Sequence, residues 1–554
     1  MIESAHNIAA NEIIRTDICI VGGGAAGISM ALAFTSQNLS VVLLESGGDK
    51  EDPHTQALYA GRVVDERLHS PPDKYRQRRW GGSTTIWGGR CMPFDPIDFE
   101  ARPQVENSGW PIAYADLARF YPKANELVEA GAFKYLADDA DPAGFPSMIR
   151  GFKSDVLRTD GLERFSRPTN MGQRYRQELT LARNVRVIQH ANCTGIRLNP
   201  EGSAVQAVDV RTLQGSRFKV QARHFVLATG GLEVPRLLLA SNDVHLHGIG
   251  NAHDNVGRYY QCHIAANVGK LVVHGDPSLT HHGYHVSPDG IYCRRRLQLT
   301  EAYQKAHLLC NLVARLHFPS ISDPQHHNGV LSGLYLARHF IGYEYGKRLR
   351  TPDKKGLGHE LKHLMNVLGH PGDVLGFLTH WLRFRTFADR KFPSIILRNR
   401  SNEFSLEVHA EQTPLRESRV TLTNQVDPLG MPRICVDWRY ASADIDMVCR
   451  TLTLMNDELQ RSGIATLTFN RNELESDLTR YGAYGGHHIG TARMGLDPRT
   501  SVVDANCKVH GVSNLHISSA ATFPTSSQAN PTLTIVALSL RLADHLSIQM
   551  AEPH

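Results

Sequence analysis

The stretch that decides the fold is Asp17-Ile18-Cys19-Ile20-Val21-Gly22-Gly23-Gly24-Ala25-Ala26-Gly27, near the start of the 554-residue chain. A short apolar, β-branched run leads into a glycine turn, and residues 28–34 continue with apolar residues at helical spacing. The order of strand, glycine turn and helix is typical of a nucleotide-binding unit. We therefore expect an α/β domain with a parallel sheet to begin here.

The glycines of this turn fit the pattern GxGxxG. Gly22 permits the tight turn, Gly24 lets the backbone approach a pyrophosphate, and Gly27 lets the helix pack on the strand. A second apolar strand, residues 41–45, ends in Glu45, whose carboxylate can accept hydrogen bonds from ribose hydroxyls. The pattern predicts a dinucleotide site; a glycine-rich loop in an unrelated α/β sheet is the alternative.

One further segment favours FAD over NAD, and another suits the approach of a flat ligand. Phe225-Val226-Leu227-Ala228-Thr229-Gly230-Gly231 is a strand followed by an ATG turn, which many flavoproteins place under the dinucleotide. Residues 78–90 contain Arg79, Gly81, Gly82, Ser83, Thr84 and Trp87, and this mixture of free amides and short hydroxyls suits close approach to a flat ligand. Taken alone, the second segment is more typical of a tight surface loop anchored by a tryptophan, and only the family resemblance given below assigns it to a flavin.

Near the C-terminus, Gly485-Gly486-His487-His488-Ile489-Gly490 places two imidazoles in a glycine-flanked stretch. Imidazole has a pKa close to working pH, so His487 and His488 are both candidate general bases. On spacing alone, such a pair also fits packing or hydrogen bonding. Asn530 precedes Pro531 and an apolar run, which predicts an N-cap and a helix whose positive end favours negative charge.

The composition excludes several classes of protein. With 41% hydrophobic and 21% charged residues and a net charge of +5, the chain is expected to be globular, without a nucleic-acid partner. The nine cysteines are scattered and show no CxxC pattern, which argues against a disulfide framework and against an iron–sulfur cluster. We predict no metal site. The N-terminus shows no leader pattern, and no apolar run could span a bilayer, so we expect a cytoplasmic protein without a transmembrane segment.

With Ser108-Gly109-Trp110-Pro111-Ile112, these motifs resemble the glucose–methanol–choline (GMC) oxidoreductase family, in particular the branch of pyranose oxidases and bacterial sugar dehydrogenases. The resemblance covers nearly the whole chain but is poor over 265–400. It implies an α/β fold (α+β overall), with a Rossmann-like doubly wound FAD-binding domain interleaved with an antiparallel-sheet substrate-binding domain. The expected FAD domain comprises 12–50, 185–262 and 480–550; the flavin-covering segment is 75–125; the substrate domain comprises 126–184 and 263–479.

The resemblance also assigns roles to residues. His487 stands seven positions before Met494 and 43 before Asn530, as in the sugar-oxidising branch, which implies His487 as base and Asn530 as the group that orients substrate; His488 stays an alternative. Pyranose oxidases carry a flavin-linking histidine where Ile86 stands here, so FAD is expected to bind non-covalently. The expected FAD-contacting residues are Gly22, Gly24, Gly27, Glu45, Arg79, Gly81, Gly82, Ser83, Thr84, Trp87, Cys193, Ala228, Ser519, Ala520, Asn530 and Thr532.

The resemblance implies oxidation of a primary or secondary alcohol on a sugar, glycoside or cyclitol, with oxygen or a quinone-type compound as electron acceptor. The sequence does not choose between oxidase and dehydrogenase. Two alternatives stay open: an FAD-containing lyase without net redox, and a flavoprotein subunit that docks an electron-transfer partner. A homo-oligomer is compatible with the sequence.

Residues 335–400 differ from the rest of the chain because they are strongly basic. Leu357, Leu361, Leu364, Met365 and Leu368 recur at helical spacing. Such a pattern most often marks a solvated helix packed on its own domain through its apolar stripe. A lid, a subunit contact, or a docking surface for an electron acceptor or a membrane are the alternatives.

Overall fold

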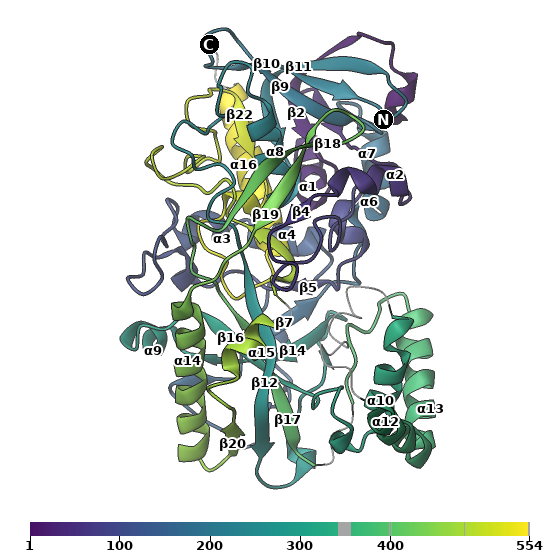
Figure 1. Ribbon diagram of the computed structural model, residues 1–554, viewed down its shortest axis with the longest axis vertical. Helices are drawn as coiled ribbons and strands as arrows, with labels where there is room; N and C mark the ends of the chain where they lie inside the picture. Colours follow the sequence, from purple (N-terminus) through teal and green to yellow (C-terminus); the bar gives the residue numbers. More distant parts are fainter. Residues whose placement is uncertain (342–355, 398, 400, 481, 552–554) are drawn as a thin grey trace.

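The computed structural model describes residues 1–341, 356–397, 399, 401–480 and 482–551. In this part of the chain the largest sheet has eight strands, in the order β1-β8-β3-β2-β11-β10-β9, with β22 beside β11 (Figure 1). Its strands are β1 (Ile2–Ser4), β8 (Val185–Gln189), β3 (Val41–Leu44), β2 (Ile13–Val21), β11 (Arg217–Leu227), β10 (Val205–Arg211), β9 (Asn192–Leu198) and β22 (Leu515–Ile517).

The predicted strand, turn and helix are confirmed in β2 and α1 (Ala25–Phe34). Gly22 has φ +113°, and a Cβ there would lie 2.6 Å from the Ala228 carbonyl oxygen. A Cβ on Gly27 would lie 1.9 Å from the Gly22 carbonyl oxygen, so α1 can approach β2 only because this residue is glycine. β2 lies parallel to β3 and β11, which gives the expected parallel core.

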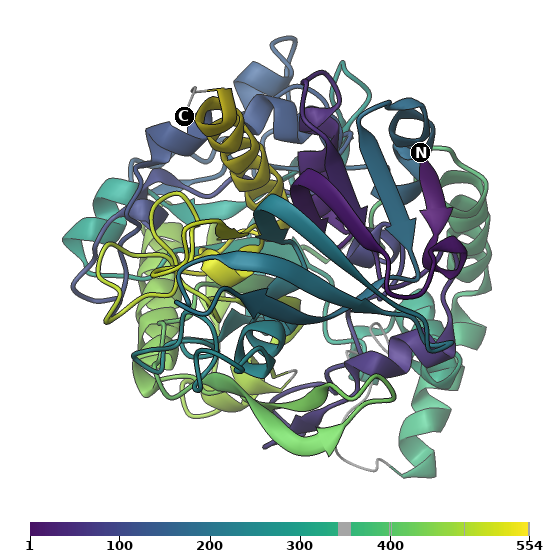
Figure 2. The ribbon, with the colours of Figure 1, turned by 90° about the horizontal axis from the view of Figure 1, so that it is seen from above.

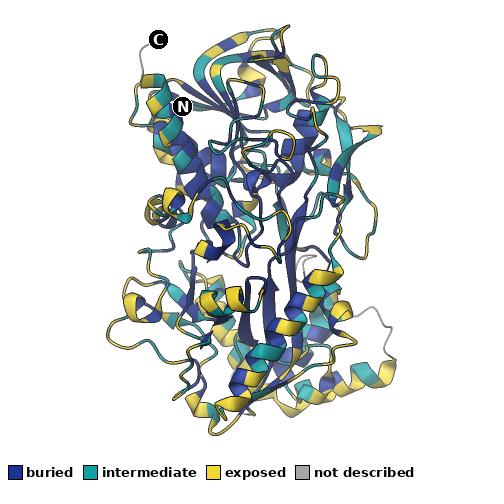
Figure 3. Ribbon diagram, turned by 90° about the vertical axis from the view of Figure 1, so that its left-hand side faces the viewer, coloured by how far each residue is buried: buried dark blue, intermediate teal, exposed yellow. Residues whose placement is uncertain are grey.

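The two ends of the chain build this nucleotide sheet together. The last helix, α16 (Thr532–Ala551), packs against α1, and β22 pairs in parallel with the end of β11. Both termini therefore lie at the same end of the molecule, and Figure 2 shows α16 beside the N-terminal strands and helix. Buried residues concentrate along the strands, whereas the outer faces of many helices are exposed (Figure 3).

A second, seven-stranded sheet forms the other half of the molecule, in the order β20-β12-β17-β16-β15-β6, with β21 beside β12. All its pairings are antiparallel, as expected for the substrate-binding part. Its strands are β20 (Ala465–Thr468), β12 (Gln261–Val273), β17 (Glu403–Ala410), β16 (Leu312–His317), β15 (Leu297–Leu299), β6 (Leu157–Arg158) and β21 (Tyr484–Ile489). Helix α14 (Ser442–Arg461) buries Met447, Leu452 and Met455 in its core.

Two small sheets flank the site. We expected β18 (Arg419–Val426) and β19 (Pro432–Asp437) among the substrate-domain strands. β18 pairs with β19, β19 pairs with β4 (Arg62–Val63), and both β18 and β19 contact α8 (Gly230–Ala240). The other small sheet is β13 (His285–Val286), β14 (Tyr292–Arg295), β7 (Leu162–Phe165) and β5 (Arg90–Cys91). The short helices are α2 (Pro53–Gln56), α3 (Tyr114–Ala118), α4 (Tyr121–Leu127), α5 (Ala137–Ala140), α6 (Met171–Arg174), α7 (Arg176–Leu181), α9 (Glu301–Ala306) and α15 (Leu474–Thr479).

The described part of the basic insertion is helical. It contains α10 (Gly329–Leu336), α12 (Leu357–Gly369), α13 (Pro371–Trp381) and a π-helical turn at Leu382–Thr386, beside the second sheet (Figure 1). The predicted leucine stripe does lie on a helix, α12, but it faces outward, because the helix packs on α10 through polar residues. Among the described residues, no helix is both long and apolar enough to cross a membrane.

Candidate active site

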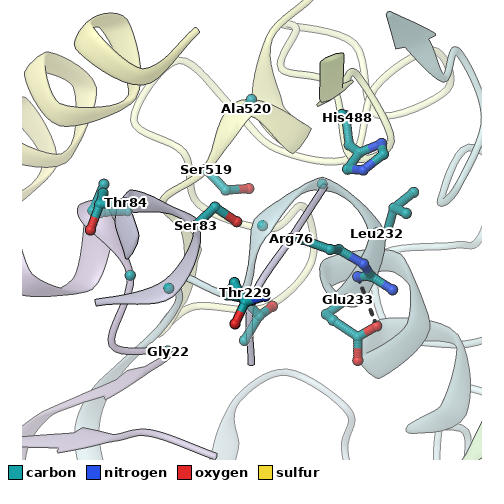
Figure 4. Close-up of a pocket in the computed structure, with 18 of the residues that line it drawn as sticks. Gly22, Arg76, Ser83, Thr84, Thr229, Leu232, Glu233, His488, Ser519 and Ala520 are labelled. Atoms are coloured by element: carbon teal, nitrogen blue, oxygen red, sulfur yellow. Dashed lines mark hydrogen bonds and ion pairs between the residues drawn. The ribbon is translucent and has the colours of Figure 1, made fainter. Parts of the chain in front are cut away.

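One cavity of about 460 Å³ extends from the N-terminal glycine turn to the C-terminal histidines. Figure 4 shows how side chains from the two ends of the sequence converge on it. Most of the expected FAD-contacting residues line it, namely Gly22, Gly24, Glu45, Gly82, Ser83, Thr84, Trp87, Cys193, Ala228, Ser519, Ala520, Asn530 and Thr532. The candidate bases His487 and His488 line the same cavity.

Gly27, Arg79 and Gly81 are not among the lining residues. Gly27 allows α1 to pack on the strand end, as described above. The Gly81 amide donates to the Gly23 carbonyl oxygen at 2.9 Å, which ties the segment at 78–90 to the glycine turn. Arg79 Nε donates to Thr85 Oγ1 at 3.1 Å. These three residues therefore shape the walls rather than face the cavity.

The nucleotide end of the cavity is organised by Glu45. Its Oε2 accepts a hydrogen bond from the Gly23 amide and its Oε1 accepts one from the Gly47 amide, each at 2.8 Å. The side chain is buried, and burial raises its pKa. Each carboxylate oxygen has further acceptor capacity for a ribose hydroxyl. Cys193, on the opposite wall, is a half-buried thiol whose pKa burial raises to about 12, so it stays neutral.

An arginine cluster that we did not predict also lines the cavity. Arg76 Nη1 lies 3.1 Å from Glu233 Oε1, and Arg78 Nη1 lies 3.0 Å from Glu233 Oε2. Burial alone would raise the pKa of Glu233, but Arg236, Arg76 and Arg78 lower it to about 2. The pairs fasten residues 76–78 to the start of α8 (Figure 4). Arg76 and Arg78 precede Glu233 by 155 residues or more, and no local sequence pattern indicates their contact with it.

The polar lining of the cavity fits a large polar ligand such as FAD. Several buried polar atoms of lining residues have no hydrogen-bond partner among the described residues: Gln77 Oε1, Arg78 Nε, Thr229 Oγ1, Tyr284 OH, His488 Nε2 and Asn530 Oδ1. A buried polar atom without a partner costs free energy unless a ligand or water satisfies it. The glycine turn, the Glu45 carboxylate and these atoms together match the chemistry of a dinucleotide.

His487 is held by two side chains. Its Nδ1 lies 2.7 Å from His263 Nδ1, and its Nε2 lies 3.2 Å from Asn530 Nδ2. His263 stands on β12, next to the strand that carries His487, and its Nε2 lies 3.2 Å from the Ser526 carbonyl oxygen. No local pattern in the sequence pointed to His263, which is 224 residues away from His487.

The hydrogen bonds fix where the protons lie. A carbonyl oxygen only accepts, so His263 Nε2 donates to Ser526. Burial lowers the pKa of His263 to about 4, so the ring is neutral and its Nδ1 is an acceptor. His487 must therefore donate from Nδ1. In its neutral form His487 then presents an unprotonated Nε2 to the Asn530 amide, and a lone pair at this position can accept a proton.

His488 lies on the same strand but belongs to another set of contacts. Its Nδ1 is hydrogen-bonded to the Tyr260 hydroxyl at 2.6 Å, and that hydroxyl is hydrogen-bonded to His69 Nε2 at 2.7 Å. Burial, with the nearby His69 and the Arg76 cation, lowers the pKa of His488 well below its ordinary value. Its Nε2 has no partner among the described residues. Figure 4 shows the ring beside Leu232 and above Arg76.

We predicted that Asn530 caps the last helix, but in the structure it does not. Its Oδ1 has no hydrogen-bond partner among the described residues, whereas a capping oxygen would accept from an amide of the first turn. The helix begins at Thr532, and the first-turn amide of Ile535 donates to the Pro531 carbonyl oxygen at 2.8 Å. The side chain of Asn530 points to His487 instead, which leaves its oxygen available to a ligand in the cavity.

Three imidazoles lie close together behind the site. Ring nitrogens of His263, His409 and His487 all lie within 4.8 Å of one another, a spacing that a metal ion could bridge. Both nitrogens of His263 are engaged in hydrogen bonds, and His409 Nδ1 donates to the Gln528 carbonyl oxygen at 2.8 Å. A metal ion would have to displace the His263–His487 bond or the His263–Ser526 bond, so the hydrogen bonds fit a proton-positioning cluster better.

Another wall of the cavity comes from the small sheet that contains β5 and β7 and from residues after the insertion helices. Arg90, Phe165, Tyr284 and Ser394 line it, and none of them was a candidate in the sequence. Arg90 lies 3.7 Å from Glu163 and 3.5 Å from Glu407, so its charge is neutralised from behind. The Tyr284 hydroxyl is buried without a partner among the described residues. This wall therefore offers hydrogen-bond donors within an otherwise apolar surface.

The nucleotide sheet, its glycine turn and the polar cavity define a flavoprotein. A family model described as FAD dependent oxidoreductase matches residues 17–327, which is more than half of the chain. The protein is an FAD-dependent oxidoreductase.

The part of the chain that carries the histidines narrows the family. A model described as GMC oxidoreductase matches residues 414–539. The resemblance to the GMC oxidoreductases that the motifs indicated is confirmed over this part of the chain. It is 22% identical to 2-methyl-1,2-propanediol dehydrogenase of Mycolicibacterium austroafricanum, over 97% of this chain and 96% of that protein. It is also 22% identical to the fructose dehydrogenase large subunit of Gluconobacter japonicus, over 97% of this chain and 98% of that protein.

A solved structure supports the same fold. The crystal structure of pyridoxine 4-oxidase from Mesorbium loti superposes with a TM-score of 0.52 and 18% identity, and the match covers 97% of this chain and all of that one. At this identity the likeness concerns the fold alone.

Proposed function

We propose that the protein oxidises a carbinol on a sugar, glycoside or cyclitol, with His487 as the general base. One observation carries the proposal: His487 Nδ1 lies 2.7 Å from His263 Nδ1 and its Nε2 lies 3.2 Å from the Asn530 amide nitrogen, an arrangement that favours an unprotonated Nε2. A base must be within hydrogen-bond reach of the proton that it removes. A hydroxyl placed between these two side chains meets that condition.

Each residue then has a separate task. Asn530 donates from Nδ2 toward the shared position, and its Oδ1 is free to accept, so the amide can hold the substrate hydroxyl in register. His487 Nε2 takes the hydroxyl proton. His263 keeps the acceptor lone pair of His487 on the cavity side, and its own lowered pKa prevents it from taking the proton onward. His263 is thus a positioning residue rather than a catalytic one.

Bound FAD supplies the acceptor for the hydride that leaves the carbinol carbon. The residues that line the cavity between Gly22 and Thr532 would hold it, and Ile86 offers no nucleophile for a covalent link. The N-terminus of α16 at Thr532 borders the cavity, and its partial positive charge favours negative charge there by about 0.3–2 kcal/mol.

Two facts support a polyhydroxylated substrate. The cavity wall beside β5 and β7 contributes Arg90, Tyr284 and Ser394, which can donate hydrogen bonds to additional hydroxyls. One relative is named for fructose and another for a propanediol, and both are hydroxyl-bearing compounds.

An anaerobic titration tests the proposal. Sugars, glycosides, cyclitols and simple alcohols are added to the yellow protein, and loss of flavin absorbance is followed. We expect bleaching with at least one polyol and none with the matching deoxy compound. If no alcohol bleaches the flavin, the oxidoreductase proposal fails, and a lyase without net redox is favoured. Reoxidation by air and then by a soluble quinone distinguishes oxidase from dehydrogenase.

A further inference from the structure

The insertion helices present an apolar surface that nothing in the described chain covers. We define the insertion patch as Leu357, Leu361, Leu364, Met365, Leu368, Leu375, Leu378, Leu382, Phe384 and Phe387. These are ten of the 23 exposed large apolar side chains among the described residues, and they fall within 31 consecutive positions. The others are scattered along the chain. Clusters of this kind mark contact surfaces, whereas single exposed leucines need no explanation.

On an ordinary surface helix the apolar face packs inward, whereas on α12 the apolar face points outward. Its inward face carries His363 and Asn366, which hydrogen-bond to Ser332 Oγ at 3.0 and 3.1 Å. His363 also stacks on Tyr335, with ring centroids 4.0 Å apart. Its outward face carries the leucines, and Leu357 is 90% exposed. The helix is therefore held in place by polar contacts, which leaves its apolar stripe for a partner.

The chain's positive charge is concentrated in the same region. Residues 335–400 hold 13 Lys and Arg against 5 Asp and Glu, while the rest of the chain holds 47 against 50. Seven of these 13 basic residues lie outside the described residues. Within the described helices, Lys362 and Arg383 are exposed, as is the acid Asp373, and the Arg383 guanidinium lies over the Phe384 ring. Leucine, phenylalanine and tryptophan with interspersed basic residues are the composition of helices that lie in the interface of an anionic membrane.

We propose that the insertion patch docks the protein onto an anionic lipid surface. A second copy of this chain fits less well, because a symmetric contact would bring two strongly basic segments together. The patch also adjoins the active site. Phe392, just beyond Phe387, packs edge-to-face on Tyr284, and the next residues, Pro393 and Ser394, line the cavity. Docking would thus bring one wall of the cavity near the lipid.

Flotation of the FAD-loaded protein with vesicles tests the proposal. Vesicles of phosphatidylcholine with phosphatidylglycerol are compared with vesicles of phosphatidylcholine alone. We expect binding to the anionic vesicles and a loss of about tenfold in the double variant Leu375→Asp, Leu378→Asp, because charge on the apolar face opposes insertion. Lys362→Glu with Arg383→Glu also weakens binding, and added salt does the same. The matched control is Leu246→Asp, since Leu246 is 77% exposed but lies far from the insertion in sequence; it leaves binding unchanged.

Three results would overturn the proposal. The first is absence of flotation with anionic vesicles. The second is equal flotation of the patch variant and the control. The third is a lipid-free dimer, measured by sedimentation over a range of protein concentrations, that the patch variant abolishes; the patch would then be an interface between copies. The patch and control variants keep flavin absorbance and circular dichroism, because the substituted side chains are exposed.

Discussion

His487 and His488 are neighbours on one strand, yet their surroundings differ completely. His487 has an imidazole behind it that fixes its proton on Nδ1, and an amide in front of its Nε2. His488 has a phenol behind it and a guanidinium near its ring, and its pKa is well below the ordinary value. Alternation along the strand sends the two rings to opposite sides. The comparison shows that a base is chosen by its neighbours rather than by its residue type.

The largest effect on the rate of flavin reduction is expected from removing the imidazole ring of His487. His487→Ala should slow anaerobic reduction of the flavin by about 10²–10⁴-fold, because the proton acceptor is lost. Stopped-flow absorbance with the best substrate measures the rate, and the flavin spectrum confirms that the site is loaded. If reduction stays fast, His487 is not the base.

The positioning residue gives the next largest effect. His263→Ala removes the acceptor that holds the His487 proton on Nδ1, so both tautomers become populated, and the reduction rate is expected to fall about 10–100-fold. His263→Gln, whose amide oxygen can accept the same bond, recovers part of the rate. Equal losses in the two variants would indicate a merely structural role, as would an unchanged pH profile.

The same residue predicts how stability depends on pH. Burial lowers the pKa of His263 from 6.5 to about 4, so between these values the unfolded chain binds a proton that the folded chain does not. The free energy of unfolding therefore falls as pH falls through this window, by on the order of 3 kcal/mol for this group. We expect the free energy of unfolding of His263→Gln to fall less between neutral pH and about pH 5 than that of the wild-type protein, as measured by urea unfolding. If the free energy of unfolding falls equally with pH in the variant and in the wild-type protein, this prediction is wrong.

His488 is expected to matter much less for the rate. His488→Ala should change flavin reduction by less than about tenfold, because a ring whose pKa is depressed beside Arg76 is a poor proton acceptor. It should instead weaken flavin binding, since its Nε2 faces the cavity. Stopped-flow rates and the dissociation constant of FAD separate the two effects. A loss of rate as large as that of His487→Ala would reverse our assignment.

The smallest effect on the rate is expected at Tyr260. Tyr260→Phe removes the hydroxyl between His488 and His69, which leaves buried nitrogens without their partner and lowers the free energy of unfolding by about 1–3 kcal/mol. The rate of flavin reduction should not change. A rate change that exceeds the change seen in His488→Ala would place this hydroxyl in the proton path.

The sequence predicted the parts of the site that depend on local patterns. The glycine turn and Glu45 lie within short motifs, whereas the pairing of His487 with Asn530, 43 residues apart, was implied by the resemblance to a family. The structure brings these residues to one cavity. His263 could not be foreseen, because its role depends on β12 lying beside β21, more than 200 residues later. Periodicity predicted the helix α12 but not its orientation, since which side packs depends on the polar contacts of α10.

The arrangement of the nucleotide sheet has a consequence for biosynthesis. β2 and β3 leave the ribosome long before β22 and α16, which follow the second sheet and the insertion along the chain. At typical synthesis rates this interval lasts about half a minute to a minute and a half. Until then, the end of β11 that pairs with β22 stays uncovered and α1 lacks its helical partner. The cavity also lacks the part of its lining that Ser519, Asn530 and Thr532 provide, so flavin fluorescence quenching is expected only after α16 has left the ribosome.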